Sequence, residues 1–279
     1  MNSSTVPSAN AVDLYLELLK RCLTREAFPE RYTSLPTKGW RAQLARLPRR
    51  ALAAGGLELV RLMPSDAQIR AEGRDWPAGA ETMIGRRRLD NLHRCLVGAL
   101  TEGVPGDFME TGVWRGGSVI FMRAALAARG DPTRCVWVAD SFQGLPPPDT
   151  KAYPADAGDS LWEMPELAVG MEEVKANFAR YGLLDERVRF LPGWFRDTLP
   201  TAPVDELAVL RLDGDLYEST MVALESLYPK LSVGGYLIVD DYGAMESCRS
   251  AVHDYRSAHR IEEPIVPVDW TGVYWRRES

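Results

Sequence analysis

The chain has no long apolar run and is poor in cysteine and histidine. None of its apolar stretches approaches the roughly 18 residues of a membrane-spanning helix. No basic segment precedes the first apolar stretch, so we expect neither a membrane span nor a signal peptide. The four cysteines lack CxxC spacing, and the three histidines lack the spacing of metal ligands. These absences disfavour a disulfide framework and a histidine metal site, and we expect a cytoplasmic protein with reduced thiols.

Positive charge is also scarce relative to negative charge. Lys and Arg number 33 against 39 Asp and Glu, which gives a formal net charge of -6. This balance argues against a nucleic-acid partner held by bulk electrostatics. The 279 residues, of which 46% are hydrophobic, are enough for one large α/β domain with or without an appendage.

Apolar segments alternate with helical patterns from residue 106 onward. We expect strands at 107–112, 133–140, 188–193, 206–213 and 236–241, and two more at 264–268 and 271–276. Helices are expected at 12–22, 86–100, 119–130, 170–181, 219–231 and 245–259. Continuously apolar strands that alternate with helices are typical of a doubly wound, mostly parallel sheet in an α/β fold.

The first 80 residues differ from this pattern. After the 12–22 helix, the segment 24–80 has scattered Pro and Gly residues and a basic stretch at 41–50. We interpret it as short helices and loops over the core. A surface or dimer-contact segment and a substrate lid both fit. We therefore divide the chain into an N-terminal helical lid segment, 1–80, and a main domain, 81–279.

Acidic residues follow the predicted strands with unusual regularity. In an open parallel sheet, ligands bind in the crevice beyond the carboxyl ends of the strands. Five acids are expected at such ends: Glu110, Asp140, Asp213, Asp240 and Asp241. The sequence therefore predicts that they lie in one crevice and take part in ligand binding.

The segment E-T-G-V-W-R-G-G-S, residues 110–118, predicts a glycine turn between a strand and a helix. Its spacing is not the G-x-G-x-x-G of a dinucleotide site. Glu110 would repel a pyrophosphate and would suit a cationic amine, whereas the helix N-terminus suits a carboxylate. The methionyl end of S-adenosylmethionine carries both groups. The alternative is a tight turn that binds no ligand.

Two further residues fit a nucleoside. A carboxylate at Asp140, at the end of the second strand, can accept both hydroxyls of a ribose. It can instead cap the helix that follows, but the neighbouring glycine turn favours the ribose. Trp194, in P-G-W-F-R-D, can stack on an adenine.

The paired acids in V-D-D-Y-G need a positive partner, because adjacent buried carboxylates repel each other. Asp240 and Asp241 follow Asp213 by 27 and 28 residues. This interval suits one crossover helix between neighbouring strands. Three converging carboxylates predict a hard divalent cation, Mg²⁺ or Ca²⁺. Asp215 can join them or cap a turn. The alternative is that one of the pair is an N-cap and the other is solvated.

Taken together, six motifs strongly resemble the macrocin O-methyltransferase family. They are T-M-I-G-x-x-R-L-D-N, E-T-G-V-W-R-G-G, A-D-S-F-x-G-L-P, L-P-G-W-F-x-D-T-L-P, L-R-L-D-G-D-L-Y and V-D-D-Y-G, and they run in consistent order between Trp76 and Trp275. The resemblance implies a Rossmann-like class I methyltransferase that uses S-adenosylmethionine and Mg²⁺. Its members methylate sugar hydroxyls of glycosylated natural products, such as macrolides and aminocoumarins.

The resemblance also implies roles for individual residues. Asp213 would be a metal ligand and the general base, and Asp240 and Asp241 would complete the metal site. The implied cofactor contacts are Thr82, Met83, Glu110, Thr111, Gly112, Val113, Trp114, Ser118, Asp140, Ser141, Gly193 and Trp194. Residues 24–75 depart from the family pattern, so the resemblance assigns nothing in the lid.

Two other functions fit part of these observations. A catechol also offers two adjacent oxygens to a metal, and the family resemblance alone favours a sugar over it. A non-catalytic scaffold that binds the cofactor or a partner is disfavoured because Asp213, Asp240 and Asp241 are all present. We expect the enzyme to act as a homodimer or a higher homo-oligomer, because the N-terminal segment is apolar enough to pack against a second copy.

Overall fold

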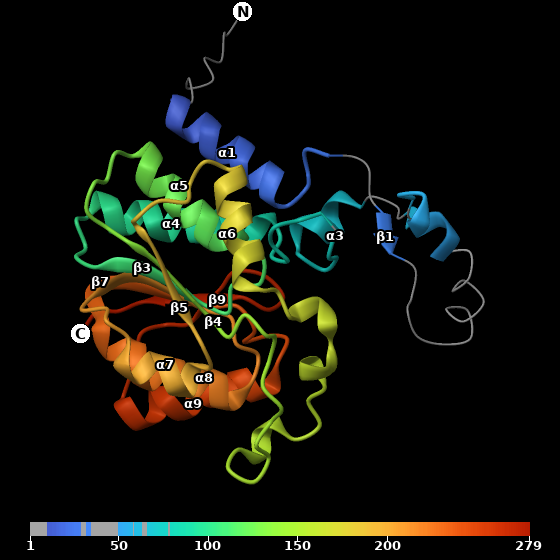
Figure 1. Cartoon of the computed structure of the whole chain (residues 1–279). Coiled ribbons are helices and arrows are strands. Elements are labelled where there is room, and N and C mark those ends of the chain that lie inside the picture. Colours follow the sequence, from blue (N-terminus) through green and yellow to red (C-terminus); the bar gives the residue numbers. More distant parts are fainter. Residues whose placement is uncertain (1–9, 29–31, 35–49, 58, 63–65, 78) are drawn as a thin grey trace, which may run out of the picture.

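The structure is a computed structural model that describes the chain except for residues 1–9, 29–31, 35–49, 58, 63–65 and 78. A seven-stranded sheet forms the middle layer between two layers of helices (Figure 1). Its strands are β3 (Asp107–Thr111), β4 (Val136–Asp140), β5 (Val188–Pro192), β6 (Leu207–Leu212), β7 (Leu231–Val239), β8 (Val266–Pro267) and β9 (Val273–Arg276).

The strand order is β5-β4-β3-β6-β7-β9-β8. The first five strands are parallel, β9 runs antiparallel to β7, and β8 runs antiparallel to β9. The chain therefore winds outward from β3 to β5 and then starts again at β6 on the other side. This confirms the doubly wound, mostly parallel sheet, and places the topological switch point between β3 and β6.

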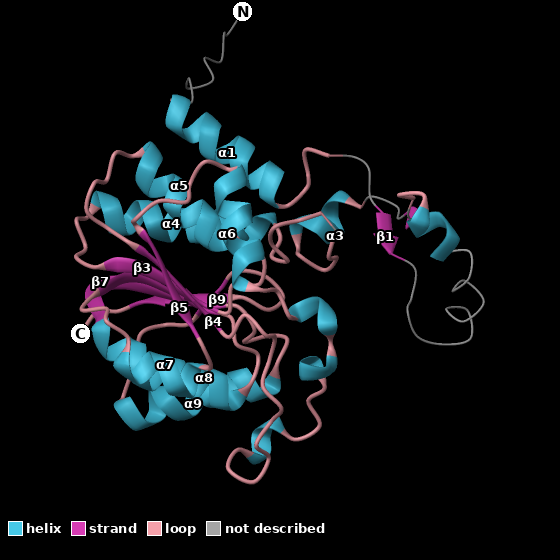
Figure 2. Ribbon diagram, in the orientation of Figure 1, coloured by secondary structure: helices cyan, strands magenta, loops and turns pink. Residues whose placement is uncertain are grey.

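Helices cover both faces of the sheet (Figure 2). One face carries α1 (Ala11–Leu23), α4 (Arg86–Thr101), α5 (Gly117–Ala128) and α6 (Met171–Arg180), and the other carries α7 (Phe195–Thr198), α8 (Tyr217–Leu227) and α9 (Glu246–His259). Each helix layer packs its own apolar cluster against the sheet. Burial of these two clusters is the main source of the fold's stability.

The loop between β4 and α6 contains three 3₁₀ turns, η1 (Pro154–Asp156), η2 (Leu161–Glu163) and η3 (Pro165–Leu167). Asp156 is buried, and its carboxylate accepts the N–H groups of Tyr217 at 2.6 Å and Glu218 at 3.1 Å. These are the first residues of α8, so the loop caps a helix that is distant in sequence. The cap ties the loop to the carboxyl edge of the sheet.

The N-terminal segment is only partly separate from the main domain. Leu16, Leu19 and Leu23 of α1 are buried against α4 and α5. Farther on, β1 (Tyr32–Ser34) and β2 (Val60–Leu62) form an antiparallel ribbon, and α3 (Ala67–Ala71) follows. The expected short helices and loops therefore also include two strands, each too short to show a period of two. Residues 41–49 of the basic stretch lie outside the described residues, and the two-domain division stays a prediction.

Gly112 allows the chain after β3 to approach the chain after β6 closely at the switch point. Its φ is +81°, in the left-handed region that favours glycine. A Cβ at this position would lie 1.6 Å from the carbonyl oxygen of Asp213. The glycine turn is thus required by the approach of the neighbouring strand end, independently of any ligand.

We expect Gly112→Ala to lower the free energy of unfolding by about 4 kcal/mol or more, because the methyl group would overlap backbone atoms that a packed sheet holds in place. Gly130→Ala is the matched control, since Gly130 also has a positive φ of +68° but no atom within 4 Å of the added methyl group. The control should lose only about 1–2 kcal/mol. Urea denaturation measures both; equal losses would contradict this account of Gly112.

Candidate active site

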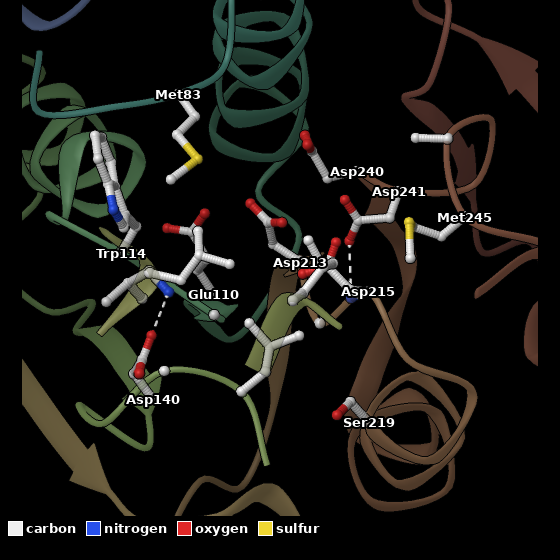
Figure 3. A pocket seen from close by; sticks show the side chains of 18 of the residues that line it. Met83, Glu110, Trp114, Asp140, Asp213, Asp215, Ser219, Asp240, Asp241 and Met245 are labelled. Carbon is white, nitrogen blue, oxygen red and sulfur yellow. Dashed lines mark hydrogen bonds between the residues drawn. The ribbon is translucent and has the colours of Figure 1, made fainter. Parts of the chain in front are cut away.

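A cavity of about 300 Å³ lies beyond the carboxyl ends of β3, β4, β6 and β7, a volume in the range of small-molecule sites. Figure 3 shows Glu110, Trp114 and Asp140 on one side, Asp241 and Met245 on the other, and Asp213 between them. The five acids predicted to share a crevice all line this cavity. The sheet topology brings them together from segments more than 100 residues apart.

Most of the expected site residues line the cavity, and two do not. Those that do are Thr82, Met83, Glu110, Gly112, Val113, Trp114, Ser118, Asp140, Ser141, Trp194, Asp213, Asp240 and Asp241. Thr111 is buried outside the lining, where its carbonyl accepts the N–H of Asp213 at 2.9 Å. Gly193 forms a turn with φ +138°, and its N–H donates to the carbonyl of Asp140 at 2.9 Å. These two residues shape the backbone, while the binding roles of the others stay predictions.

Three of the acids converge at the ends of two neighbouring strands. Asp213 follows β6, and Asp240 and Asp241 follow β7, which pairs with β6 in parallel. One carboxylate oxygen from each lies within 4.8 Å of the other two. Oxygen ligands at this spacing suit one divalent cation, whose bonds to oxygen are about 2.0–2.6 Å long. The Asp241 carboxylate also accepts the N–H of Asp215 at 3.1 Å (Figure 3).

Two arginines that the sequence analysis did not single out lie beneath the acids. Arg211, on β6, is buried, and its guanidinium group pairs with Glu110 and Asp240 and donates to Asp213 at 2.7 Å. Arg88, on α4, pairs with the other oxygen of Asp240. We call Glu110, Asp213, Asp215, Asp240 and Asp241 the acid cluster. Within the described residues, Arg88 and Arg211 supply the guanidinium groups that pair with it.

The five carboxyl groups of the acid cluster outnumber the two guanidinium groups, so the cluster has excess negative charge when it is ionised. Burial, followed by the nearby Asp240 carboxylate, raises the pKa of Asp213. Burial, followed by the charge of Asp213, raises the pKa of Asp215 to about 8. The pKa of Asp241 is raised well above its ordinary value, first by burial and then by Asp215. The site therefore has room for added positive charge, which is what a divalent cation and a sulfonium cofactor would bring.

Glu110 has one carboxylate oxygen that lacks a partner. Its Oε1 pairs with Arg211, whereas its buried Oε2 has no hydrogen-bond partner. Burial raises the pKa of Glu110 to about 8, and the Arg211 charge opposes this only in part. An unpartnered carboxylate oxygen beside the N-terminus of α5 suits an ammonium group with a carboxylate nearby.

Asp140 is held by the backbone on both sides. One oxygen accepts the N–H of Val113 at 2.8 Å, and the other accepts the N–H of Phe142 at 2.7 Å. Burial raises the pKa of Asp140, and these two bonds oppose that rise. Each carboxylate oxygen can accept a second hydrogen bond, so the fixed side chain still fits a ribose. In the described stretch after Asp140, no helix begins before η1 at Pro154, so Asp140 does not cap a following helix as the alternative supposed. The ribose contact stays a prediction.

The segment that carries Thr82 and Met83 is tied down from two directions. The N–H of Gly117, which begins α5, donates to the carbonyl of Glu81 at 2.8 Å. The buried guanidinium group of Arg70, on α3, donates to the carbonyls of Met83 at 3.0 Å and Ile84 at 2.6 Å. The N-terminal segment thus helps to fix one wall of the cavity through Arg70, which the sequence pattern did not reveal.

Comparison with known proteins decides the family. The model of the macrocin O-methyltransferase (TylF) family matches residues 12–277. The chain belongs to this family. It is 52% identical over 271 residues to 8-demethyl-8-(2,3-dimethoxy-alpha-L-rhamnosyl)-tetracenomycin-C 4'-O-methyltransferase of Streptomyces olivaceus, with 97% of this chain and 95% of that protein covered.

Other relatives agree. The chain is 56% identical over 211 residues to demethyldecarbamoylnovobiocin O-methyltransferase of Streptomyces niveus, with 75% of this chain and 80% of that protein covered. The solved structure of the O-methyltransferase NovP superimposes with a TM-score of 0.84 at 45% identity, covering 96% of this chain and all of that one. These findings confirm the resemblance and the class I methyltransferase fold. The chain is an S-adenosylmethionine-dependent O-methyltransferase.

The described part of this macrocin-type methyltransferase contains no helix that is both long and apolar enough to cross a membrane.

The raised pKa values predict how Mg²⁺ acts on stability. Above the ordinary carboxyl range near about 4 and up to about 8, where Asp215 titrates, the acid cluster holds more protons in the folded protein than in the unfolded chain. Without metal, the contribution of the acid cluster to stability therefore falls as pH rises through this window. We expect MgCl₂ to raise Tm more at about pH 8 than at about pH 6, as measured by scanning calorimetry.

Asp241→Asn should remove most of this pH-dependent gain, because it deletes one ligand charge and keeps the acceptor for the Asp215 N–H. Asp205→Asn, an exposed acid just before β6, is the control and should behave as the wild type. A Tm gain that is equal at both pH values, or unchanged in Asp241→Asn, would contradict a cation at the acid cluster.

Proposed function

We propose that this enzyme transfers the methyl group of S-adenosylmethionine to a sugar hydroxyl of a glycosylated natural product, with a divalent cation, Mg²⁺ by expectation, held by the acid cluster. The observation that carries the proposal is the convergence of three carboxylate oxygens within 4.8 Å at the ends of β6 and β7. Relatives with 52% and 56% identity, named for a rhamnosyl tetracenomycin and a novobiocin precursor, support the acceptor class.

The cofactor fits the β3 side of the cavity. The unpartnered oxygen of Glu110 suits the α-ammonium group, and the N-terminus of α5 suits the α-carboxylate. Asp140 ends β4 and Ser141 follows it, where the ribose is expected, and Trp194, at the start of α7, lines the same cavity. We assign Thr82, Met83 and Ser118 to the methionyl part, because Ser118 lies in the first turn of α5 and the segment of Thr82 and Met83 is bonded to that turn through Glu81 and Gly117.

The residues that would hold the cation are Asp213, Asp240 and Asp241. A bound dication would lower the pKa of a coordinated hydroxyl and balance the excess negative charge. Asp240 is the least free of the three, because both of its oxygens pair with arginines. Its fixed orientation, together with the bond from Arg211 to Asp213, keeps the carboxylates directed at one point.

We assign the role of general base to Asp213. It lies between the cofactor side of the cavity and the side formed by Asp241 and Met245 (Figure 3). A carboxylate there can take the proton of an acceptor hydroxyl as the oxygen attacks the methyl carbon, in line with the departing sulfur.

The two alternative functions, a catechol methyltransferase and a non-catalytic scaffold, receive less support. A catechol acceptor would use the same metal site, but the relatives that match most of this chain are named for glycosylated antibiotics. A non-catalytic scaffold would have no need for the three converging carboxylates of Asp213, Asp240 and Asp241. Homo-oligomer formation and a cytoplasmic location stay predictions.

Asp213→Asn should separate catalysis from cofactor binding. We expect kcat to fall by roughly 10²- to 10⁴-fold because the base is lost, while the affinity for S-adenosylhomocysteine, measured by calorimetry, stays within about threefold of the wild type. Turnover is followed with labelled S-adenosylmethionine on rhamnosyl and catechol acceptors, with and without EDTA. Asp205→Asn, at the opposite end of β6, is the control.

Chelation should abolish turnover of the rhamnosyl acceptor, and added MgCl₂ should restore it. Wild-type rates in Asp213→Asn would rule out the base, activity that survives EDTA would rule out the cation, and turnover of catechols alone would rule out the sugar acceptor.

A further inference from the structure

The loop that joins β8 to β9 packs directly on the V-D-D-Y-G turn of the acid cluster. The N–H of Gly243 donates to the carbonyl of Thr271 at 2.8 Å, and the Thr271 hydroxyl donates to the carbonyl of Asp240 at 2.8 Å. A Cβ at Gly243 would lie 2.3 Å from the carbonyl oxygen of Trp270. The position of Trp270 is therefore set by the same backbone that places Asp240 and Asp241.

The indole ring of Trp270 is fixed as well. Its Nε1–H donates to the carbonyl of Glu72 at 2.8 Å, and the Arg74 guanidinium carbon lies 4.3 Å from the ring centroid. Arg74 is itself paired with the Glu72 carboxylate at 2.9 Å. One edge and one face of the ring are thus supported from the turn after α3.

Despite this support the ring is not buried. Trp270 is 39% exposed and lines the cavity. Trp76, two residues beyond Arg74, is 50% exposed and lines the same cavity. Met245, which Figure 3 places beside Asp241, adds an apolar side chain at this end. The carboxylate of Asp241 and the exposed ring of Trp270 therefore share one side of the cavity, because Trp270 is held by the turn that follows Asp241.

An exposed ring that is held in one orientation binds planar apolar groups at little entropic cost. At the acid cluster the acceptor must present oxygens, so its apolar part has to extend toward the rings. We propose that Trp270, with Trp76, binds the aglycone of the acceptor, and that this aglycone is planar and largely apolar. The assignment rests on the proposed sugar acceptor and adds the part of the substrate beyond the sugar.

Two probes with one sugar test the proposal: 4-nitrophenyl α-L-rhamnoside, which has an aromatic aglycone, and methyl α-L-rhamnoside, which has none. Binding to the enzyme with S-adenosylhomocysteine and MgCl₂ is measured by calorimetry, and turnover is measured separately. The wild type should bind the aromatic glycoside roughly 3- to 10-fold more tightly than the methyl glycoside. Trp270→Ala should bring this ratio close to one by weakening the aromatic glycoside alone, and Trp270→Phe should keep part of it.

The matched control is Trp162→Ala. Trp162 is 42% exposed but does not line the cavity, so the ratio should not change. Affinity for S-adenosylhomocysteine and Tm should stay near wild-type values in Trp270→Phe, which separates a local effect from misfolding.

An unchanged ratio in Trp270→Ala, a wild type without preference, or a wild type that binds neither glycoside would each overturn the proposal. Binding with the expected ratio but without methylation would support aglycone binding by Trp270 and contradict the sugar acceptor. Methylation of both probes without preference would contradict aglycone binding by Trp270 and leave the sugar acceptor standing.

Discussion

Excess negative charge in a buried space is the constraint on which this active site depends. Five carboxyl groups of the acid cluster meet at the edge of the sheet. Among the described residues, the guanidinium groups that pair with them are those of Arg88 and Arg211. Ionised carboxylates out of water cost several kcal/mol each unless they are compensated. The enzyme therefore gives up folding free energy at this site, and added positive charge, from the sulfonium cofactor and from the proposed divalent cation, would restore it.

The backbone concentrates this charge through close approaches that only glycine permits. Gly112 lets the end of β6 reach the end of β3, and Gly243 lets the β8–β9 loop rest on the paired aspartates. The two contacts unite the cofactor side, the acids and Trp270 in one framework. Arg70 adds the segment of Thr82 and Met83 to it from α3. A rigid scaffold of this kind keeps donor and acceptor aligned for an in-line transfer.

Much of this arrangement follows from sequence, because strand ends are visible as apolar runs that stop at an acid. The neighbouring positions of Asp213 and Asp240 were predictable from one helix-length interval, and the structure pairs β6 with β7. Arg211 escaped notice because a charge within an apolar strand gives no sign of which partners it meets across the sheet. The two contacts of Asp140 with the backbone, and the burial of Thr111 outside the cavity lining, depend on local geometry that spacing does not encode. The ribbon of β1 and β2 has strands too short for periodicity to reveal.

The position of a bound cation tests the central claim most directly. Crystals of the enzyme with S-adenosylhomocysteine, soaked in MnCl₂, would locate the ion by anomalous diffraction. We expect one strong peak among the carboxylates of Asp213, Asp240 and Asp241, at about 2.0–2.3 Å from their oxygens. No peak at that point under saturating Mn²⁺, with the three carboxylates facing only water, would contradict the account.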